Sequence, residues 1–228
     1  MISVNELTKS FGNKQVLNCR SVHFQHQLVH GIIGLNGAGK TTFFNILSGF
    51  LAANTGVVLD NERPLRREDV AYLESENFFY SYLTGEEYLS IFPCTNQDFH
   101  VERMNDLIKL PLRELIETYS SGMRKKLALL AILRQDKPIY LLDEPFNGLD
   151  LETNQILRLI IQRLVRKGKT IFMSSHILAP LTELCNEIHL LHNGVFTKTY
   201  EGGSFHAIET DLFAGSDKSI TQILDSSL

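Results

Sequence analysis

Four short apolar runs recur along the chain, and each ends in polar or glycine residues. They are 29–35 (VHGIIGL), 138–145 (PIYLLDEP), 169–176 (KTIFMSSH) and 187–194 (EIHLLHNG). Apolar runs without hydrophobic–polar alternation predict strands that are buried on both faces of a parallel sheet. Ligands of such sheets bind beyond the carboxyl ends of the strands, which is where the polar residues fall.

Amphipathic segments between the runs predict helices that cover the sheet. One face of segment 151–168 carries apolar residues at helical spacing, namely Ile156, Leu157, Ile160, Ile161 and Leu164. Gly168 is a suitable end for that helix. Residues 41–49 (TTFFNILSG) predict a further helix that ends at Gly49. Alternating strands and helices predict an α/β fold.

Two regions depart from this pattern. The first 25 residues contain short, β-branched segments (ISVNELTKSF, KQVL and SVHFQ), which predict a small N-terminal antiparallel β subdomain. The sequence of 84–135 is mostly helical in character, so we expect a helical insertion at approximately 76–135 between two core strands. The polar tail at 203–228 predicts short helices. We expect one domain over 1–228.

Composition narrows the class of protein. The chain has 228 residues, 21% of them charged, and a net charge of −4, so no nucleic-acid partner is expected. No apolar run reaches the length of a membrane span, and the N-terminus lacks a secretory signal, so we expect a cytoplasmic protein. Three widely spaced cysteines, Cys19, Cys94 and Cys185, argue against a disulfide scaffold or a zinc site.

Residues 34–42 (GLNGAGKTT) match the phosphate-binding pattern G-x-x-x-x-G-K-[ST], the Walker A motif. Phosphate oxygens need several converging backbone N–H donors, and glycine permits the turns and the close approach. The following helix adds unpaired N–H groups at its positive end. The motif predicts a P-loop NTPase core that binds ATP through Asn36, Gly37, Ala38, Gly39, Lys40, Thr41 and Thr42. We expect Lys40 to reach the β- and γ-phosphates and Thr41 to ligate Mg²⁺.

Two acidic residues, Asp143 and Glu144, follow the apolar run IYLL directly. Both are therefore expected at the carboxyl end of a strand. Asp143 is predicted to hold Mg²⁺ through water, and Glu144 to polarise the water that attacks the γ-phosphate.

Together these motifs resemble the ABC (ATP-binding cassette) ATPase family over about 200 residues. The sequence NGLD (147–150) resembles the family's D-loop and ends in Asp150, and SSH (174–176) resembles its switch region. Tyr119–Met123 (YSSGM) stands where the family has its LSGGQ signature. Walker A, signature, Walker B (Asp143, followed by Glu144), D-loop and switch histidine follow in the family's order.

The resemblance implies specific roles for further residues. His176 would contact the γ-phosphate, and Phe11 would stack on adenine. Ser120 and Gly122, at the start of a helix, would close on the ATP of a second ABC ATPase subunit. Two ATPs would thus be sandwiched in a homodimer or heterodimer under a membrane-spanning permease subunit, which would hold the chain at the inner face of the membrane. YSSGMRKKL resembles the signature of cassettes for drug, antibiotic and polysaccharide export, which favours an exporter.

Two departures from the family pattern stand out. Ser121 and Met123 replace Gly and Gln of the signature. Where the family has its Q-loop glutamine, the chain has Ser75, flanked by Glu74 and Glu76. Glu76 is a candidate substitute ligand for that glutamine, and the alternative is a solvated acidic loop.

A cluster of aromatic residues follows, namely Phe78, Phe79, Tyr80 and Tyr82. In the family this stretch borders the groove for a cytoplasmic helix of the permease. The alternative is that these side chains form the core of the helical insertion.

Two other functions stay open at this stage. One is a soluble cassette for Fe–S assembly, and another is a regulatory subunit that binds ATP but hydrolyses it poorly. A different P-loop enzyme, such as a kinase, would not need the signature, D-loop and switch histidine together.

Overall fold

A six-stranded sheet forms the centre of the computed structural model, which describes residues 1–95 and 99–213. Its strand order is β10-β9-β3-β8-β7-β6. The strands are β3 (Val29–Ile33), β6 (Val70–Leu73), β7 (Ile139–Asp143), β8 (Thr170–Ser175), β9 (Glu187–His192) and β10 (Val195–Glu201). All neighbours pair in parallel except β10, which is antiparallel to β9. The predicted, mostly parallel sheet is confirmed, and all four apolar runs contain strands.

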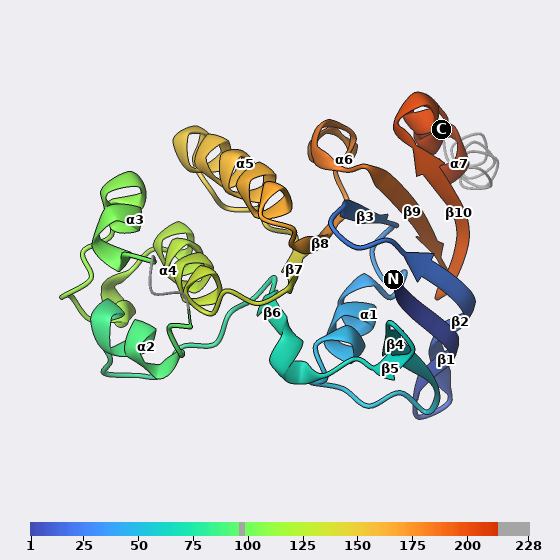
Figure 1. The fold of residues 1–228 in the computed structure, drawn as a ribbon, viewed down its shortest axis with the longest axis horizontal. Coiled ribbons are helices and arrows are strands. Elements are labelled where there is room, and N and C mark those ends of the chain that lie inside the picture. Colours follow the sequence, from blue (N-terminus) through green and yellow to red (C-terminus); the bar gives the residue numbers. More distant parts are fainter. Residues whose placement is uncertain (96–98, 214–228) are drawn as a thin grey trace, which may run out of the picture.

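A second sheet of four antiparallel strands lies beside the first (Figure 1). Its order is β2-β1-β4-β5, with bounds β1 (Ile2–Phe11), β2 (Lys14–Phe24), β4 (Thr55–Asp60) and β5 (Arg63–Pro64). The predicted antiparallel sheet at the N-terminus is therefore confirmed. Phe24 at the end of β2 contacts Phe43 and Phe172, so the two sheets share one apolar core.

The chain between β6 and β7 is largely helical. It contains α2 (Gly85–Ile91), α3 (Val101–Ile108), the 3₁₀ turn η2 (Ile116–Thr118) and α4 (Ser121–Arg134). These elements form a separate apolar cluster around Tyr88, Tyr119 and Leu130. In Figure 1 they lie on the far side of β6 and β7 from helix α1 (Lys40–Leu47).

A further apolar core lies between the six-stranded sheet and three helices. These helices are α4, α5 (Leu151–Arg166) and α6 (Leu178–Leu184). Gly49 and Gly168, the predicted helix stops, have φ angles of 74° and 79°, the left-handed conformation that ends helices. A 3₁₀ turn, η1 (Arg67–Asp69), precedes β6.

The predicted tail helices are present as far as the structure describes the chain. They are η3 (Gly202–Ala207) and α7 (Ile208–Phe213), and residues 214–228 lie outside the described part. Ile208 and Leu212 are buried, and Asp211 accepts hydrogen bonds from Tyr200 (2.6 Å) and Lys198 (2.7 Å), so α7 docks on β10. Within residues 1–95 and 99–213, no helix is long and apolar enough to cross a bilayer.

Candidate active site

The loop between β3 and α1 has a backbone that only glycines allow. A Cβ atom on Gly34 would lie 2.3 Å from the backbone oxygen of Leu191 on β9. Gly37 and Gly39 have φ angles of 82° and 108°, which L side chains rarely adopt. The pattern of glycines that predicted a phosphate loop is thus required by the loop's shape.

Helix α1 begins without a capping side chain. Its N-cap residue is Gly39, and no side chain accepts a hydrogen bond from the first turn. The N–H groups of this turn are therefore available for an anion, as predicted for residues 39–42. Lys40 is 8% exposed, and its ammonium group donates to the backbone oxygen of Gly34 at 2.7 Å. Burial lowers the pKa of Lys40, against the opposing effect of Glu144 and Asp143.

Thr41 and Asp143 meet at the mouth of this loop. The Thr41 hydroxyl donates to Oδ2 of Asp143 at 2.7 Å, and Asp143 is fully buried at the end of β7. Adjacent ligands of an octahedral Mg²⁺ with bonds of about 2.1 Å lie about 2.9 Å apart. A hydroxyl and a carboxylate at this spacing are hard oxygen donors that fit Mg²⁺, directly or through water.

Ser174, at the end of β8, connects the two predicted acidic residues. Its hydroxyl donates to Oδ1 of Asp143 and accepts from the backbone N–H of Glu144 at 3.0 Å. The sequence named Ser174 only as part of the switch pattern. Ser174 can bridge Asp143 and Glu144 because it lies opposite Asp143 in the parallel register of β7 and β8.

Glu144 and His176 face each other beyond the strand ends. Nδ1 of His176 lies 3.0 Å from Oε1 of Glu144, and the two side chains are 45% and 15% exposed. Glu144 has a φ angle of 48°, a left-handed conformation that is uncommon outside glycine, asparagine and aspartate. Such strain persists where the surroundings fix the backbone, and it is common at functional sites. The two predicted catalytic residues are therefore brought together with Lys40, Thr41 and Asp143.

Ser174 binds the backbone N–H of Glu144, and Lys125 binds its backbone oxygen. Lys125 was not identified from the sequence. It is 8% exposed on α4, and its ammonium group donates to the backbone oxygens of Glu144 and Asn147, the latter at 3.1 Å. Burial lowers the pKa of Lys125, and the nearby charges of Glu144 and Asp143 oppose this effect. Only the position of Lys125 within the signature helix hints at this role in the sequence.

Helix α4, which is capped by Ser120 and contains Gly122, lies on the far side of β6 and β7 from helix α1, which follows the phosphate loop (Figure 1). Ser120 caps α4 by accepting from the N–H of Met123 at 3.2 Å, as predicted. A Cβ atom on Gly122 would lie 2.9 Å from the backbone oxygen of Gly148, so the helix start packs directly against the predicted D-loop. Asp150 caps α5 through the N–H of Thr153 (2.7 Å).

Phe11 ends strand β1 with its side chain 52% exposed. The hairpin of β1 and β2 contacts the phosphate loop, since a Cβ atom on Gly39 would lie 3.0 Å from the backbone oxygen of Val16. The ring of Phe11 is thus exposed on a hairpin that contacts the phosphate loop, and its stacking on adenine stays a prediction.

Residues 74–76 replace the Q-loop glutamine, and their side chains lie in two different surroundings. Burial, and then the charge of Asp143, raise the pKa of Glu74, which is partly buried. Ser75 and Glu76 instead line a depression of about 460 Å³ that also contains Ser121 and Lys125. The charge of Asp143 thus acts on Glu74, and the role of Glu76 as a substitute for the Q-loop glutamine stays a prediction.

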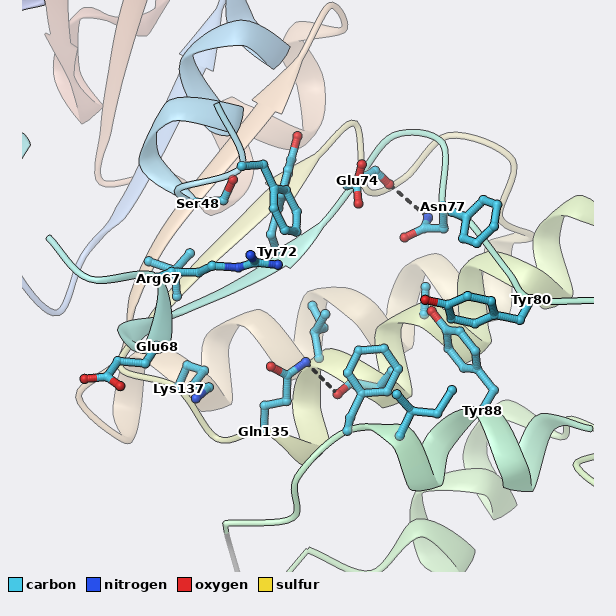
Figure 2. A pocket seen from close by; sticks show the side chains of 18 of the residues that line it. Ser48, Arg67, Glu68, Tyr72, Glu74, Asn77, Tyr80, Tyr88, Gln135 and Lys137 are labelled. Carbon is cyan, nitrogen blue, oxygen red and sulfur yellow. Dashed lines mark hydrogen bonds between the residues drawn. The ribbon is translucent and has the colours of Figure 1, made fainter. Parts of the chain in front are cut away.

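A wider groove of about 790 Å³ lies between the sheet and the helical region (Figure 2). Phe50, Tyr72, Phe78 and Tyr80 line it together with Arg66, Arg67, Glu68 and Glu74. Phe78 and Tyr80 are 73% and 57% exposed and contact each other edge to face, with ring centroids 5.2 Å apart. Phe79, by contrast, packs on Tyr88 within the helical cluster. The aromatic cluster is therefore divided, because Phe78 and Tyr80 line the groove and Phe79 belongs to the core of the helical region.

Most residues of this site lie in a segment that matches a known protein family. A profile of the family described as "ABC transporter" matches residues 17–147. That span includes the phosphate loop, Ser120, Gly122, Asp143 and Glu144. It excludes Phe11, Asp150 and His176.

Relatives in sequence carry the same family designation. The lantibiotic transport ATP-binding protein SrtF of Streptococcus pyogenes is 29% identical, with 89% of this chain and 92% of SrtF aligned. The bacitracin transport ATP-binding protein BcrA of Enterococcus faecalis is 28% identical, with 100% and 79% aligned. An uncharacterized ABC transporter ATP-binding protein of Nostoc is 34% identical, but the chain spans only 53% of its length.

Solved structures agree with the fold. A structure titled as the ATP-binding subunit of an ABC transporter has a TM-score of 0.82 at 26% identity and covers 93% of this chain and 94% of its own. A dimeric ATP-binding cassette bound to ADP and phosphate has a TM-score of 0.78 at 20% identity, with 89% and 99% covered. The latter shows similarity of fold alone.

Proposed function

Because the chain belongs to the ABC transporter family, we propose that it is the ATP-binding and ATP-hydrolysing subunit of a transporter, and that a dimer of such subunits drives a separate membrane-spanning permease. The observation that carries the proposal is the chain of contacts from Thr41 through Asp143 and Ser174 to Glu144 and His176. These contacts connect the proposed Mg²⁺ ligands, Thr41 and Asp143, to the candidate base Glu144 beside the phosphate loop.

Binding of ATP follows from the loop and the start of α1. The backbone N–H groups of Gly37–Thr42 and the Lys40 ammonium group would surround the phosphates, and Phe11 would stack on the base. Lys40 is held by backbone oxygens and not by a carboxylate, so it can turn to a phosphate without breaking an ion pair. Thr41 and Asp143 would hold Mg²⁺, which neutralises phosphate charge when it is bound.

Hydrolysis requires a group that orients water at the γ-phosphate. Glu144 occupies that place, with its carboxylate fixed by His176 on one side and Asn147 (3.4 Å) on the other. Its backbone is held at the N–H by Ser174 and at the oxygen by Lys125. Positioning of this kind and electrostatic stabilisation supply most of the rate in phosphoryl transfer.

A second cassette is needed to complete the site. Ser120 is exposed at the start of α4, and α4 lies on the far side of β6 and β7 from α1, the helix that follows the chain's own phosphate loop. The same helix start on a partner subunit would supply these groups in a dimer. Either a second copy of this chain or a different cassette satisfies the geometry.

The groove of Figure 2 is the proposed contact with the permease, since it combines exposed aromatic rings with charges of both signs. This contact would place the chain at the cytoplasmic face of the membrane. The names of SrtF and BcrA, both antibiotic-peptide transport proteins, together with the YSSGM signature, favour export.

Calorimetric titration of ATP with Mg²⁺, followed by an assay of phosphate release, tests the proposal. Wild-type chain and a Lys167→Ala control, which alters an exposed lysine at the end of α5, should bind ATP and hydrolyse it. Lys40→Ala should lose affinity. Equal ATP affinity in Lys40→Ala and wild type would overturn the assignment of the phosphate loop.

A further inference from the structure

Three potential metal ligands lie together on the main sheet, away from the phosphate loop. They are His30 on β3 and Glu187 and His189 on β9. In the parallel register of these strands, His30 lies opposite Glu187, and His189 is two residues farther along β9. Side chains at such positions project from the same face of a sheet. The pairing of the strands therefore collects the three side chains at one point.

Their ligand atoms form a nearly equilateral triangle. Nδ1 of His30 lies 3.3 Å from Nε2 of His189 and 3.4 Å from Oε2 of Glu187, and the third side is 3.5 Å. A triangle with these sides has a centre about 2.0 Å from every corner, which is the length of zinc bonds to histidine nitrogen and to carboxylate oxygen. Ligands of a tetrahedral zinc ion are themselves about 3.3 Å apart. The triangle thus has the dimensions of a zinc site.

Both imidazole rings are also oriented from their far sides. Nε2 of His30 lies 2.7 Å from the backbone oxygen of Gln25, and a carbonyl can only accept. His30 therefore carries its proton on Nε2, and the neutral ring presents a lone pair at Nδ1. Nδ1 of His189 lies 3.0 Å from the Thr199 hydroxyl on β10. Metal-binding histidines characteristically have such partners for the other ring nitrogen, because these fix the ring and its tautomer.

The protonation state and the surroundings suit a cation. Burial lowers the pKa of His30 to about 4 and that of His189 to about 3, so both rings are neutral at physiological pH. Glu187 lies directly opposite Glu201 on β10, and burial followed by the charge of Glu201 raises the pKa of Glu187. Like charges opposite each other destabilise a sheet, and a bound cation would offset this repulsion.

Aromatic rings close the site on the side of the second sheet. Phe24 contacts both imidazoles edge to face, with centroids 5.3 Å from His30 and 4.7 Å from His189. Phe172 lies 5.3 Å from His30, and both histidines are at most 1% exposed. Only Glu187, with 14% of its side chain exposed, connects the group to solvent. An ion here would join strands and have little access to a substrate.

We propose that His30, Glu187 and His189 bind one structural Zn²⁺ ion, with water in the fourth position on the side of Glu187. Neutral imidazoles and a carboxylate at tetrahedral spacing are the ligand set that suits zinc. The ion ties β9 to β3, the strand that leads into the phosphate loop. The cysteine count argued against zinc, whereas this site needs no cysteine and depends on a strand pairing that the sequence does not display.

The test uses the untagged, chelator-stripped chain without nucleotide, in excess Mg²⁺ so that the Thr41–Asp143 pair does not take up the probe. Calorimetry with Zn²⁺ should show one ion per chain, with a rise in Tm. Co²⁺ should give the intense visible absorption of a tetrahedral site. Glu187→Gln and His189→Gln should each weaken Zn²⁺ binding by about 100-fold or more and abolish the Co²⁺ bands.

The matched control is His192→Gln, which alters an exposed histidine at the end of the same strand. It should bind Zn²⁺ as wild type does. Circular dichroism and ATP affinity check that the variants fold. If the variants fail to fold, the wild-type Co²⁺ spectrum decides on its own. Weak octahedral bands, or Zn²⁺ affinity equal in wild type and Glu187→Gln, would show a hydrogen-bonded histidine pair without a metal and would overturn the proposal.

Discussion

Lys125 of the signature helix donates a hydrogen bond to the backbone oxygen of Glu144, the candidate catalytic base. The same ammonium group holds the backbone oxygen of Asn147 at 3.1 Å. Lys125 lies five residues beyond Ser120, the residue that caps α4 and is proposed to meet the partner's ATP. A movement of α4 on dimer closure would therefore be transmitted directly to the backbone that carries Glu144.

Lys125→Met should lower kcat by about 10-fold or more while ATP affinity changes little, because a small displacement of Glu144 disturbs the attacking water. Loss of two hydrogen bonds to partly buried backbone oxygens should also lower Tm. Arg124→Met is the control, since exposed Arg124 donates to Glu117 and has no hydrogen bond to Glu144. Steady-state phosphate release gives the two constants. An unchanged kcat in folded Lys125→Met would show that the contact is structural only.

His176→Ala should reduce kcat by about 10²- to 10³-fold, because it removes the partner of the Glu144 carboxylate and, with it, the proposed polar contact to the γ-phosphate. ATP binding, measured by calorimetry, should survive, since the phosphate loop is untouched. His192→Ala, at an exposed position on β9, should retain wild-type activity. Full activity of His176→Ala would remove His176 from the catalytic group.

Glu74 gives a prediction about pH. Its folded-state pKa is raised by burial and by Asp143, so between the unfolded and folded values the native chain binds more protons than the unfolded chain. Stability from this residue is therefore present at low pH and is lost as pH rises through the folded pKa. Glu74→Gln should raise Tm at pH 7.5, and the gain should shrink as pH falls toward 4.5.

Exposed Glu76→Gln is the control for this pH series and should show a much smaller gain. Thermal melts of the nucleotide-free chain across that range make the measurement. A gain from Glu74→Gln that does not vary with pH would contradict the raised pKa of Glu74 in the folded chain.

Phe78→Ala with Tyr80→Ala should release the chain from membranes in its native cell while leaving the ATPase activity of the isolated chain unchanged. Both rings line the groove of Figure 2, and neither belongs to the nucleotide site. Leu159→Ala, which removes an exposed apolar side chain from α5, should leave membrane association intact. Membrane and soluble fractions are compared by immunoblotting. Equal membrane association of all three proteins would exclude the groove as the contact.

The sequence was sufficient for the parallel sheet and the phosphate loop because these depend on local pattern. Apolar runs mark buried strands, and the glycines at 37 and 39 occupy backbone conformations that other residues avoid. Asp143 and Ser174 could each be placed at a strand end, but their contact required the register of β7 and β8.

Other features depend on packing between distant segments. Lys125 reaches Glu144 only because α4 packs against the loop after β7, and nothing in RKKL distinguishes one lysine from the next. Glu76 stays the predicted substitute for the missing glutamine, and the fold adds Glu74, whose pKa is raised by burial and by the charge of Asp143. Adjacent residues at a strand end point in different directions, and a sequence does not fix which one turns inward.

The proposed ATP-bound dimer is tested most directly by light scattering of Glu144→Gln with and without Mg²⁺ and ATP. Removing the base while keeping the phosphate loop should stall hydrolysis with ATP bound. The mutant should therefore shift from monomer to dimer when ATP is added, and more completely than wild type does. A mutant that stays monomeric with ATP bound and hydrolyses it at the wild-type rate would contradict both the role of Glu144 and the shared nucleotide site.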